Sequence, residues 1–180
     1  MTEEREAAVS LFIRRWGEMA ASWGISRTMA EIHALLYISP EPLCADDVMD
    51  QLAVSRGSTS TNLRELLNWG LIYRTHQRGD RKDYFEAEKD VWSMFEIIIR
   101  ERRRREIQPI LETIERCARM IDEGAKGLRG QAKKDALSAK ARFTEMLNFF
   151  GLMNSVFDVT TKAGRMGLKP FIQTVTKMVR

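Results

Sequence analysis

Cysteine, proline and glycine are all scarce in this sequence. The two cysteines, Cys44 and Cys117, lie far apart and form no CxxC pair, which argues against a disulfide framework and a zinc site and fits a reducing cytoplasm. Only 4 prolines and 11 glycines occur among the 180 residues, so a loop-rich β fold and a disordered chain are both disfavoured. The long stretches that lack both residues predict helices.

Long apolar runs are also missing. No stretch of about 18 apolar residues is present, so we expect no membrane span. The start of the chain, Met1–Ala8, is charged and lacks the apolar centre of a signal peptide. Both absences predict a cytoplasmic protein with no membrane partner.

Motifs for catalysis and metal binding are absent as well. The sequence has no P-loop, no GxSxG and no HExxH. His33 and His76 are isolated, without other ligands at metal spacing. The acidic group Asp46, Asp47 and Asp50 is better explained as charge at the start of a helix. We therefore expect no enzyme, no cofactor and no metal; a small hydrolase would need a residue cluster that we do not find.

Positive charge is concentrated in one segment. The formal net charge is only +4, but residues 56–82 carry six cations against Glu65 and Asp80 alone. These cations are Arg56, Arg64, Arg74, Arg78, Arg81 and Lys82. An acidic stretch, residues 41–50, lies just upstream. A basic stripe beside an acidic neighbour suits a surface that docks on phosphate in one orientation.

The first half of the chain predicts four helices. Apolar residues at three- and four-residue steps predict helices over Glu4–Ser22 and Ala30–Ile38, the second capped by Ser26. A short helix follows from Asp46 to about Leu52. The fourth helix, Ser55–Trp69, starts at a serine cap and ends at Gly70.

A β-hairpin follows these helices. The expected strands are 71–75 and 81–86, with a turn at 76–80. Helix, turn, helix and basic hairpin together predict a winged helix-turn-helix, with the hairpin as the wing. The fold class is therefore mainly α: a winged helix-turn-helix with a small β-hairpin wing and long N- and C-terminal dimerisation helices.

The rest of the chain predicts further helices. A helix from Asp90 should kink or restart at Pro109, and the best break is Gly124–Gly130. Two more helices are expected at Ala132–Val156 and Phe157–Met178. The predicted domains are an N-terminal dimerisation helix (1–24), the winged helix-turn-helix (25–89) and a C-terminal helical dimerisation region (90–180).

The outer face of the fourth helix carries small and hydrogen-bonding residues. Leu63, Leu66 and Leu67 form its buried side, with Thr59 near it. The opposite face and its flank hold Gly57, Ser58, Thr61, Asn62, Arg64, Glu65 and Asn68. A helix that enters the major groove needs small residues near the backbone and short polar groups facing base edges. The bland alternative is a surface helix rich in Ser and Thr, which are mediocre helix formers.

The hairpin turn places three cations around one carboxylate. We expect Asp80 to orient Arg81 for phosphate or minor-groove contact, and Gly79 to supply the positive φ of a tight turn. The alternative is an exposed turn whose charges only favour solubility. The predicted DNA-binding residues are Ser55, Arg56, Gly57, Ser58, Thr61, Asn62, Arg64, Arg74, Arg78, Arg81 and Lys82, and the wing-organising residues are Gly79 and Asp80.

Three other features have a functional and a structural interpretation. The run Arg100–Arg105 could contact DNA, but such runs are more often the solvated face of a helix. The residues Trp16, Trp23, Trp92 and Phe95 could form an aromatic box for a quaternary ammonium, although core packing is favoured by their spacing. Cys44, near a helix start, could be a redox switch, with a packed cysteine as the default.

Two segments of this region resemble a known family. The run from Val54 to Ile72, followed by Gly79-Asp80-Arg81-Lys82-Asp83-Tyr84-Phe85, is similar to the GbsR-type branch of the MarR superfamily of bacterial transcriptional regulators. Asp90-Val91-Trp92 and Arg105-Glu106-Ile107-Gln108-Pro109 also resemble that branch. The resemblance covers about residues 4–121 and implies a winged-helix homodimer that controls nearby genes. Some relatives sense choline-like osmoprotectants, which implies a small-molecule effector.

The sequence thus predicts a dimeric, sequence-specific DNA-binding regulator, acting as a repressor on a pseudo-palindromic operator. One module of this size makes too few base contacts for a unique genomic site, so pairing is expected. The predicted dimer-interface residues are Phe12, Trp16, Leu147, Phe150 and Phe157. The alternative function is a winged-helix protein-interaction module without sequence-specific DNA binding.

Overall fold

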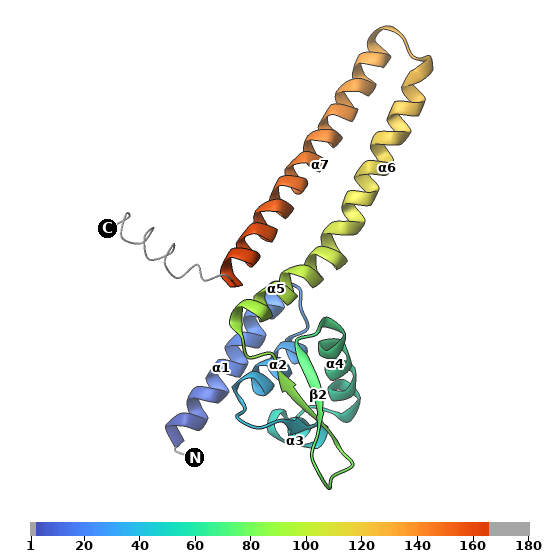
Figure 1. The fold of residues 1–180 in the computed structure, drawn as a ribbon. Coiled ribbons are helices and arrows are strands. Elements are labelled where there is room, and N and C mark those ends of the chain that lie inside the picture. Colours follow the sequence, from blue (N-terminus) through green and yellow to red (C-terminus); the bar gives the residue numbers. More distant parts are fainter. Residues whose placement is uncertain (1–2, 166–180) are drawn as a thin grey trace, which may run out of the picture. The chain divides into compact units, whose positions relative to one another are not determined.

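The computed structural model describes residues 3–165 and divides the chain into two compact units, Met1–Ile98 and Ile99–Arg180. The elements up to the boundary are α1 (Glu3–Ser22), α2 (Arg27–Ile38), β1 (Leu43–Cys44), α3 (Ala45–Leu52), α4 (Arg56–Trp69), β2 (Ile72–His76), β3 (Asp83–Ala87) and α5 (Val91–Arg102), within which the boundary falls (Figure 1). The elements after it are η1 (Arg103–Ile107), α6 (Gln108–Gly124), η2 (Ala125–Gly127) and α7 (Gly130–Arg165). The mainly helical fold class with a small wing is confirmed.

Local capping explains where the helices of the first unit begin and end. The Ser26 hydroxyl accepts a hydrogen bond from the Met29 N–H at 3.3 Å, and the Ser55 hydroxyl accepts one from the Ser58 N–H at 3.3 Å. Gly70 ends α4 with φ of 79° and donates its N–H to the last carbonyls of the helix. The predicted caps are confirmed, because each depends on residues within one turn.

The turn between α3 and α4 is tight. Ala53 ends α3 in the left-handed region, with φ of 52°. A residue with a Cβ adopts this conformation only where the surroundings require it. Here it lets two helices follow one another within three residues, which gives the helix-turn-helix its geometry.

The wing belongs to a three-stranded antiparallel sheet with strand order β1-β3-β2. The pairs Ile72↔Ala87 and His76↔Asp83 fix the register of the hairpin, and Leu43↔Phe85 adds β1 at the other edge of β3. The sequence predicted the hairpin but missed β1, which is only two residues long. Because β1 leads directly into α3, the sheet ties the wing to the helix-turn-helix.

The core of the first unit collects side chains from α1 to α5. Ile32, Leu36, Val48, Leu66 and Ile72 are almost completely buried. Thr59 is 1% exposed, and its hydroxyl donates to the Ser55 carbonyl at 3.0 Å. The inner face of α4 is thereby fixed on the core, and its outer face is left to solvent.

Lys89 connects the end of β3 to α2. Its ammonium donates to the carbonyls of Leu36, Tyr37 and Ser39 at 2.8, 2.6 and 3.0 Å. These carbonyls lie at the C-terminal, negative end of α2, where a cation is favourable. Partial burial lowers the pKa of Lys89.

The second unit is built around an antiparallel helical hairpin, in which α6 and α7 pack side by side (Figure 1). On α7, less exposed residues recur every three or four positions and form the side toward α6; they include Phe143, Leu147, Phe150 and Phe157. Ile114 is buried on α6. Lys140 and Asp122 form an ion pair across the hairpin at 2.5 Å.

Two helix boundaries after residue 100 differ from the predictions. The chain passes through a π-helical turn, Arg103–Ile107, and α6 then begins with Pro109 in its first turn, where proline costs no hydrogen bond. The predicted division at residues 156 and 157 is wrong, because α7 runs through it without a break to Arg165. Gly164, Gly167 and Pro170 are predicted to interrupt the last helix. Gly164 lies within α7, and the rest of that predicted helix, 166–178, lies outside the described residues.

Most of the four aromatic residues considered above, as a quaternary-ammonium site or as core, are neither. Trp16 is half-buried against the core, but Trp23, Trp92 and Phe95 are 55, 41 and 41% exposed. Core packing was therefore a wrong prediction for these three. The apolar residues of α5 itself lie on every face of the helix, so their spacing alone could not identify the face that is buried. That face contains Met94 and Ile97.

The arginine run Arg100–Arg105 is paired within its own unit. Glu101 is 6% exposed and accepts from Arg104 at 2.7 Å, with Arg105 at 3.6 Å. Arg103 pairs with Asp158 at 3.2 Å. These contacts favour a structural role for the run over a second DNA contact.

Candidate nucleic-acid interface

The outer face of α4 is open to solvent. Its exposed residues are Arg56, Gly57, Ser60, Thr61, Arg64 and Asn68. They recur at steps of three and four, so they share one side of the helix. Ser60 was missed by the sequence analysis, although its position four residues after Arg56 could have indicated it.

Gly57 is the smallest residue of this face. It lies in the first turn of α4, and a Cβ added to it would meet nothing within 4 Å. Glycine is unfavourable in a helix compared with alanine, by up to about 1 kcal/mol. Nothing within the described residues requires a glycine here, so the absent side chain leaves room for something outside the chain.

Three polar side chains of α4 already have partners inside the fold. The Asn62 amide donates to the Ser58 carbonyl at 2.8 Å, and its oxygen accepts from Ser26 at 3.4 Å. The Glu65 carboxylate accepts from the Trp69 indole at 3.1 Å. Ser58 and Asn62 are half-buried, so they lie at the edge of the face and not at its centre.

The tip of the wing is organised by Asp80. Gly79 takes φ of 89°, as predicted for the turn. The Asp80 carboxylate accepts from the Lys82 N–H at 2.9 Å and from the Tyr84 hydroxyl at 2.8 Å. These bonds lower the pKa of Asp80, with the backbone bond contributing most, and raise the pKa of Tyr84.

The predicted contact from Asp80 to the Arg81 side chain is therefore wrong. A carboxylate at this place in a tight turn is within reach of the backbone N–H two residues on, which is the Asx-turn geometry. Asp80 consequently shapes the turn itself, and the Arg81 side chain projects from it without that bond.

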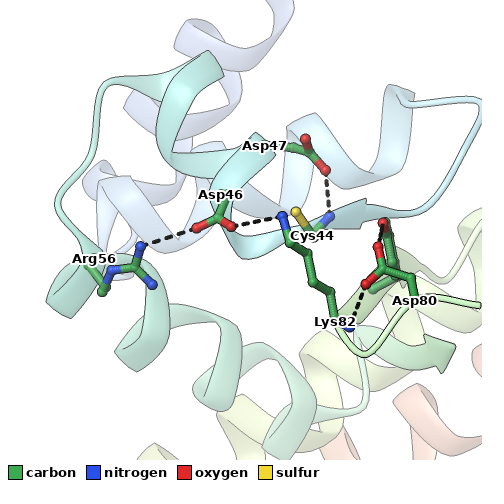
Figure 2. A network of polar contacts seen from close by, with 7 residues as sticks. Cys44, Asp46, Asp47, Arg56, Asp80 and Lys82 are labelled. Atoms are coloured by element: carbon green, nitrogen blue, oxygen red, sulfur yellow. Dashed lines mark hydrogen bonds and ion pairs between the residues drawn. The ribbon is translucent and has the colours of Figure 1, made fainter. Parts of the chain in front are cut away.

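The six cations of the basic stripe fall into two groups. Figure 2 shows Asp46 between Arg56 and Lys82, and its two carboxylate oxygens lie 3.2 and 3.1 Å from their nitrogens. Arg74 pairs with Asp83 at 3.2 Å. Arg64, Arg78 and Arg81 have no ion-pair partner within residues 3–165. The sequence did not identify Asp46 or Asp83 as partners, because each pair joins residues of different elements.

The predicted dimer-interface residues lie in both units. Phe12 and Trp16 are half-buried on α1, with ring centroids 5.7 Å apart. Leu147, Phe150 and Phe157 are half-buried on the α6 side of α7. Part of their apolar surface is therefore already used within their own units.

Two kinds of feature were sought over the described part of the chain. None of its helices combines the length and hydrophobicity that crossing a bilayer requires. Its His, Cys, Asp and Glu side chains include no group of three or more that could hold a metal ion.

Comparison with known proteins finds one family model and several relatives. A model of the MarR family matches residues 23–83, which include the whole helix-turn-helix and β2. The HTH-type transcriptional repressor GbsR of Bacillus subtilis (strain 168) is 28% identical over 77% of this chain and 81% of that repressor. Residues 23–83 thus match the MarR family, and most of the chain is similar to the repressor GbsR.

Further relatives of this chain have related names. The putative HTH-type transcriptional regulator YvaV of Bacillus subtilis (strain 168) is 26% identical, over 50% of this chain and 51% of that protein. A solved structure described as a transcriptional regulator matches with a TM-score of 0.60 and 24% identity, over 88% of this chain and 99% of its own. These relatives and this solved structure are all described as transcriptional regulators.

Proposed function

We propose that this regulator binds a pseudo-palindromic operator as a homodimer, represses the genes beside it and is released by a small molecule. The observation that carries the proposal is the exposed outer face of α4, small and hydrogen-bonding, next to a wing with unpaired arginines. The helix would enter the major groove and the wing would grip the adjacent backbone.

Within this proposal the residues have different roles. The first turn of α4 offers the Ser55 cap, Arg56 and the bare backbone of Gly57 to the edge of the groove. Thr61 and Arg64 face the bases, together with Ser60 and Asn68. Arg64 is the strongest candidate for specific contact, because a guanidinium pairs in bidentate fashion with guanine.

The dimer proposal is supported by an apolar stripe on α7. Phe149, Leu152, Val156 and Val159 recur at steps of three and four and are 58, 65, 49 and 66% exposed. They lie opposite the side that faces α6. A stripe of this kind is costly in water and suits a second copy of the same helix. We propose the interface on this stripe, on the face of α7 opposite the predicted Leu147, Phe150 and Phe157.

Replacing Leu152 with lysine is expected to convert the dimer to a monomer at micromolar concentration, because a charge would be buried in the apolar interface. Size-exclusion chromatography with light scattering measures the mass. The control is Ala132→Lys, which adds the same charge at an exposed position near the start of α7. A dimer that survives Leu152→Lys would move the interface elsewhere.

The effector proposal is supported by a cavity of about 180 Å³ in the first unit. Phe12, Trp16, Tyr37 and His33 line it, together with three aliphatic residues. Aromatic rings attract a quaternary ammonium through cation–π interaction, which fits a choline-like osmoprotectant. His33 offers the Nε2 atom, which is buried and makes no hydrogen bond with the described residues.

The function is tested by selecting genomic fragments with the purified protein and measuring their release by choline. We expect a short palindromic fragment to be enriched, with affinity that falls steeply as salt rises. The neutral isostere 3,3-dimethylbutanol is the control, since it keeps the shape and lacks the charge. Release by choline but not by the isostere supports a quaternary ammonium as the effector. Release by neither compound excludes a choline-like effector.

Failure to enrich any fragment would contradict DNA recognition itself. The alternative, a protein-interaction module on the same scaffold, then predicts that Arg81→Ala dissolves a protein complex while leaving DNA binding unchanged. The solvent-exposed wing arginines favour the DNA-binding proposal, because phosphate is the ligand that such unpaired cations bind best.

A further inference from the structure

The two ion pairs of Asp46 join three separate elements of the DNA-binding unit. Asp46 lies in the first turn of α3, Arg56 begins α4, and Lys82 lies directly before β3. The Oδ1 atom of Asp46 lies 3.2 Å from a guanidinium nitrogen of Arg56, and its Oδ2 atom lies 3.1 Å from Nζ of Lys82 (Figure 2). Each carboxylate oxygen therefore pairs with one cation. One carboxylate therefore links α4 and the wing to α3.

The charges of this cluster stabilise one another. The bond to Lys82, followed by its charge and that of Arg56, lowers the pKa of Asp46. Asp46 is also the largest cause of the raised pKa of Lys82. Both shifts favour the charged forms of Asp46 and Lys82 at neutral pH, and the one carboxylate faces two cationic side chains.

Both pairs are open to solvent. The side chains of Arg56, Lys82 and Asp46 are 79, 54 and 42% exposed. Exposed ion pairs contribute little to stability and can be exchanged for other partners at low cost. A DNA phosphate that approaches α4 or the wing is such a partner, and it must compete with Asp46 for the same two nitrogens.

We infer that Asp46 is a positioning residue that competes with DNA phosphate for Arg56 and Lys82, and so restrains non-specific binding. The inference rests on the proposed function. Random DNA must displace the carboxylate with phosphate contacts alone, whereas the operator also gains base contacts. Asp46 would thereby raise the ratio of specific to non-specific affinity, the quantity that matters in a genome full of competing sites.

The test compares Asp46→Asn with Asp50→Asn on a random-sequence duplex. Asp50 lies on the same helix, is exposed and has no ion-pair partner among the described residues, so both variants remove the same formal charge. For Asp46→Asn we expect binding about five- to tenfold tighter at about 0.1 M salt, with a log–log salt slope steeper by about 1 to 2. For Asp50→Asn we expect a change below about twofold, because Asp50 pairs with neither Arg56 nor Lys82 and its removal frees no cation for phosphate.

A double-mutant cycle separates competition from a general structural effect. In the background Arg56→Ala/Lys82→Ala, the further change Asp46→Asn is expected to leave the salt slope unchanged, since the two contested cations are gone. Melting temperatures of all variants report whether the fold is intact.

The outcomes are distinct. A wild-type protein that binds no duplex even at low salt overturns both the proposed function and this inference. A wild-type protein that binds, with equal effects of Asp46→Asn and Asp50→Asn, overturns the inference alone. Weaker binding by Asp46→Asn also overturns it, because Asp46 would then be a scaffold that the complex needs.

Discussion

The double variant Arg78→Ala/Arg81→Ala is expected to bind its operator about 100-fold more weakly than the wild-type protein, at about tenfold for each charge-assisted phosphate contact. Both arginines lie at the wing tip and have no ion-pair partner among the described residues, so they are free to bind phosphate without breaking an existing bond. The log–log salt slope should become shallower by about 2. Binding titrations at several salt concentrations measure both quantities.

The matched control is Arg129→Ala/Lys133→Ala, which removes the same formal charge. Both positions are exposed; Arg129 directly precedes α7 and Lys133 lies in its first turn. It should change the affinity by less than about threefold, since neither residue belongs to the wing or to the outer face of α4. Equal losses in the two double variants would mean that net charge, and not a wing contact, determines binding.

Acidification between about pH 6.5 and pH 4 is expected to destabilise the fold through His33. The side chain is 3% exposed, and its burial, reinforced by the charge of Lys89, lowers the pKa of His33 to about 4. Below pH 6.5 the unfolded chain binds a proton that the folded chain does not, so stability falls with pH until the folded pKa is reached. The full loss is about 3 kcal/mol.

The variant His33→Leu tests this expectation. Urea unfolding at about pH 7.5 and pH 5 should show a wild-type loss of about 2 kcal/mol from this group, and the variant should lack it. The variant should be no less stable at pH 7.5, because it also removes the buried Nε2 that lacks a hydrogen bond within residues 3–165. Exposed His76, changed to Gln, is the control. A variant with the wild-type pH dependence would exclude His33 as its source.

The arginine and histidine predictions probe different parts of the same unit. The wing arginines are available because the nearby Asp80 carboxylate bonds to the Lys82 N–H and the Tyr84 hydroxyl, while His33 is held neutral because the core excludes water. The first is expected to change DNA affinity without changing stability, and the second to change stability without touching the DNA-binding face. A variant that changes both would indicate that the wing and the core are coupled.

Features that depend on neighbouring residues were predictable. The caps Ser26 and Ser55, the stop at Gly70 and the turn at Gly79 each follow from residues within one helical turn or one hairpin. The exposed face of α4 was predictable for the same reason, because the leucines fix which side is buried. Ser60 belongs to the same face, four residues after Arg56.

Features that depend on residues far apart in the chain could not be predicted from the sequence. Asp46 and Lys82 are 36 positions apart, and only the sheet that places β3 beside α3 brings them together. The carboxylate of Asp80 could bond either to Arg81 or to the backbone, and only the shape of the turn decided for the backbone. Because α5 has apolar residues on every face, any face of it could be buried, and only the packing of the core decided that Met94 and Ile97 are.

By itself the sequence determined the order of the first helices, the hairpin and the exposed face of α4, since these follow from short-range periodicity and capping. Tertiary structure alone decided which cations are free and which are held by Asp46 or Asp83, and which apolar stripe of α7 remains uncovered. The physical reason is that charge pairing and burial depend on distances between elements, and local sequence does not encode those distances.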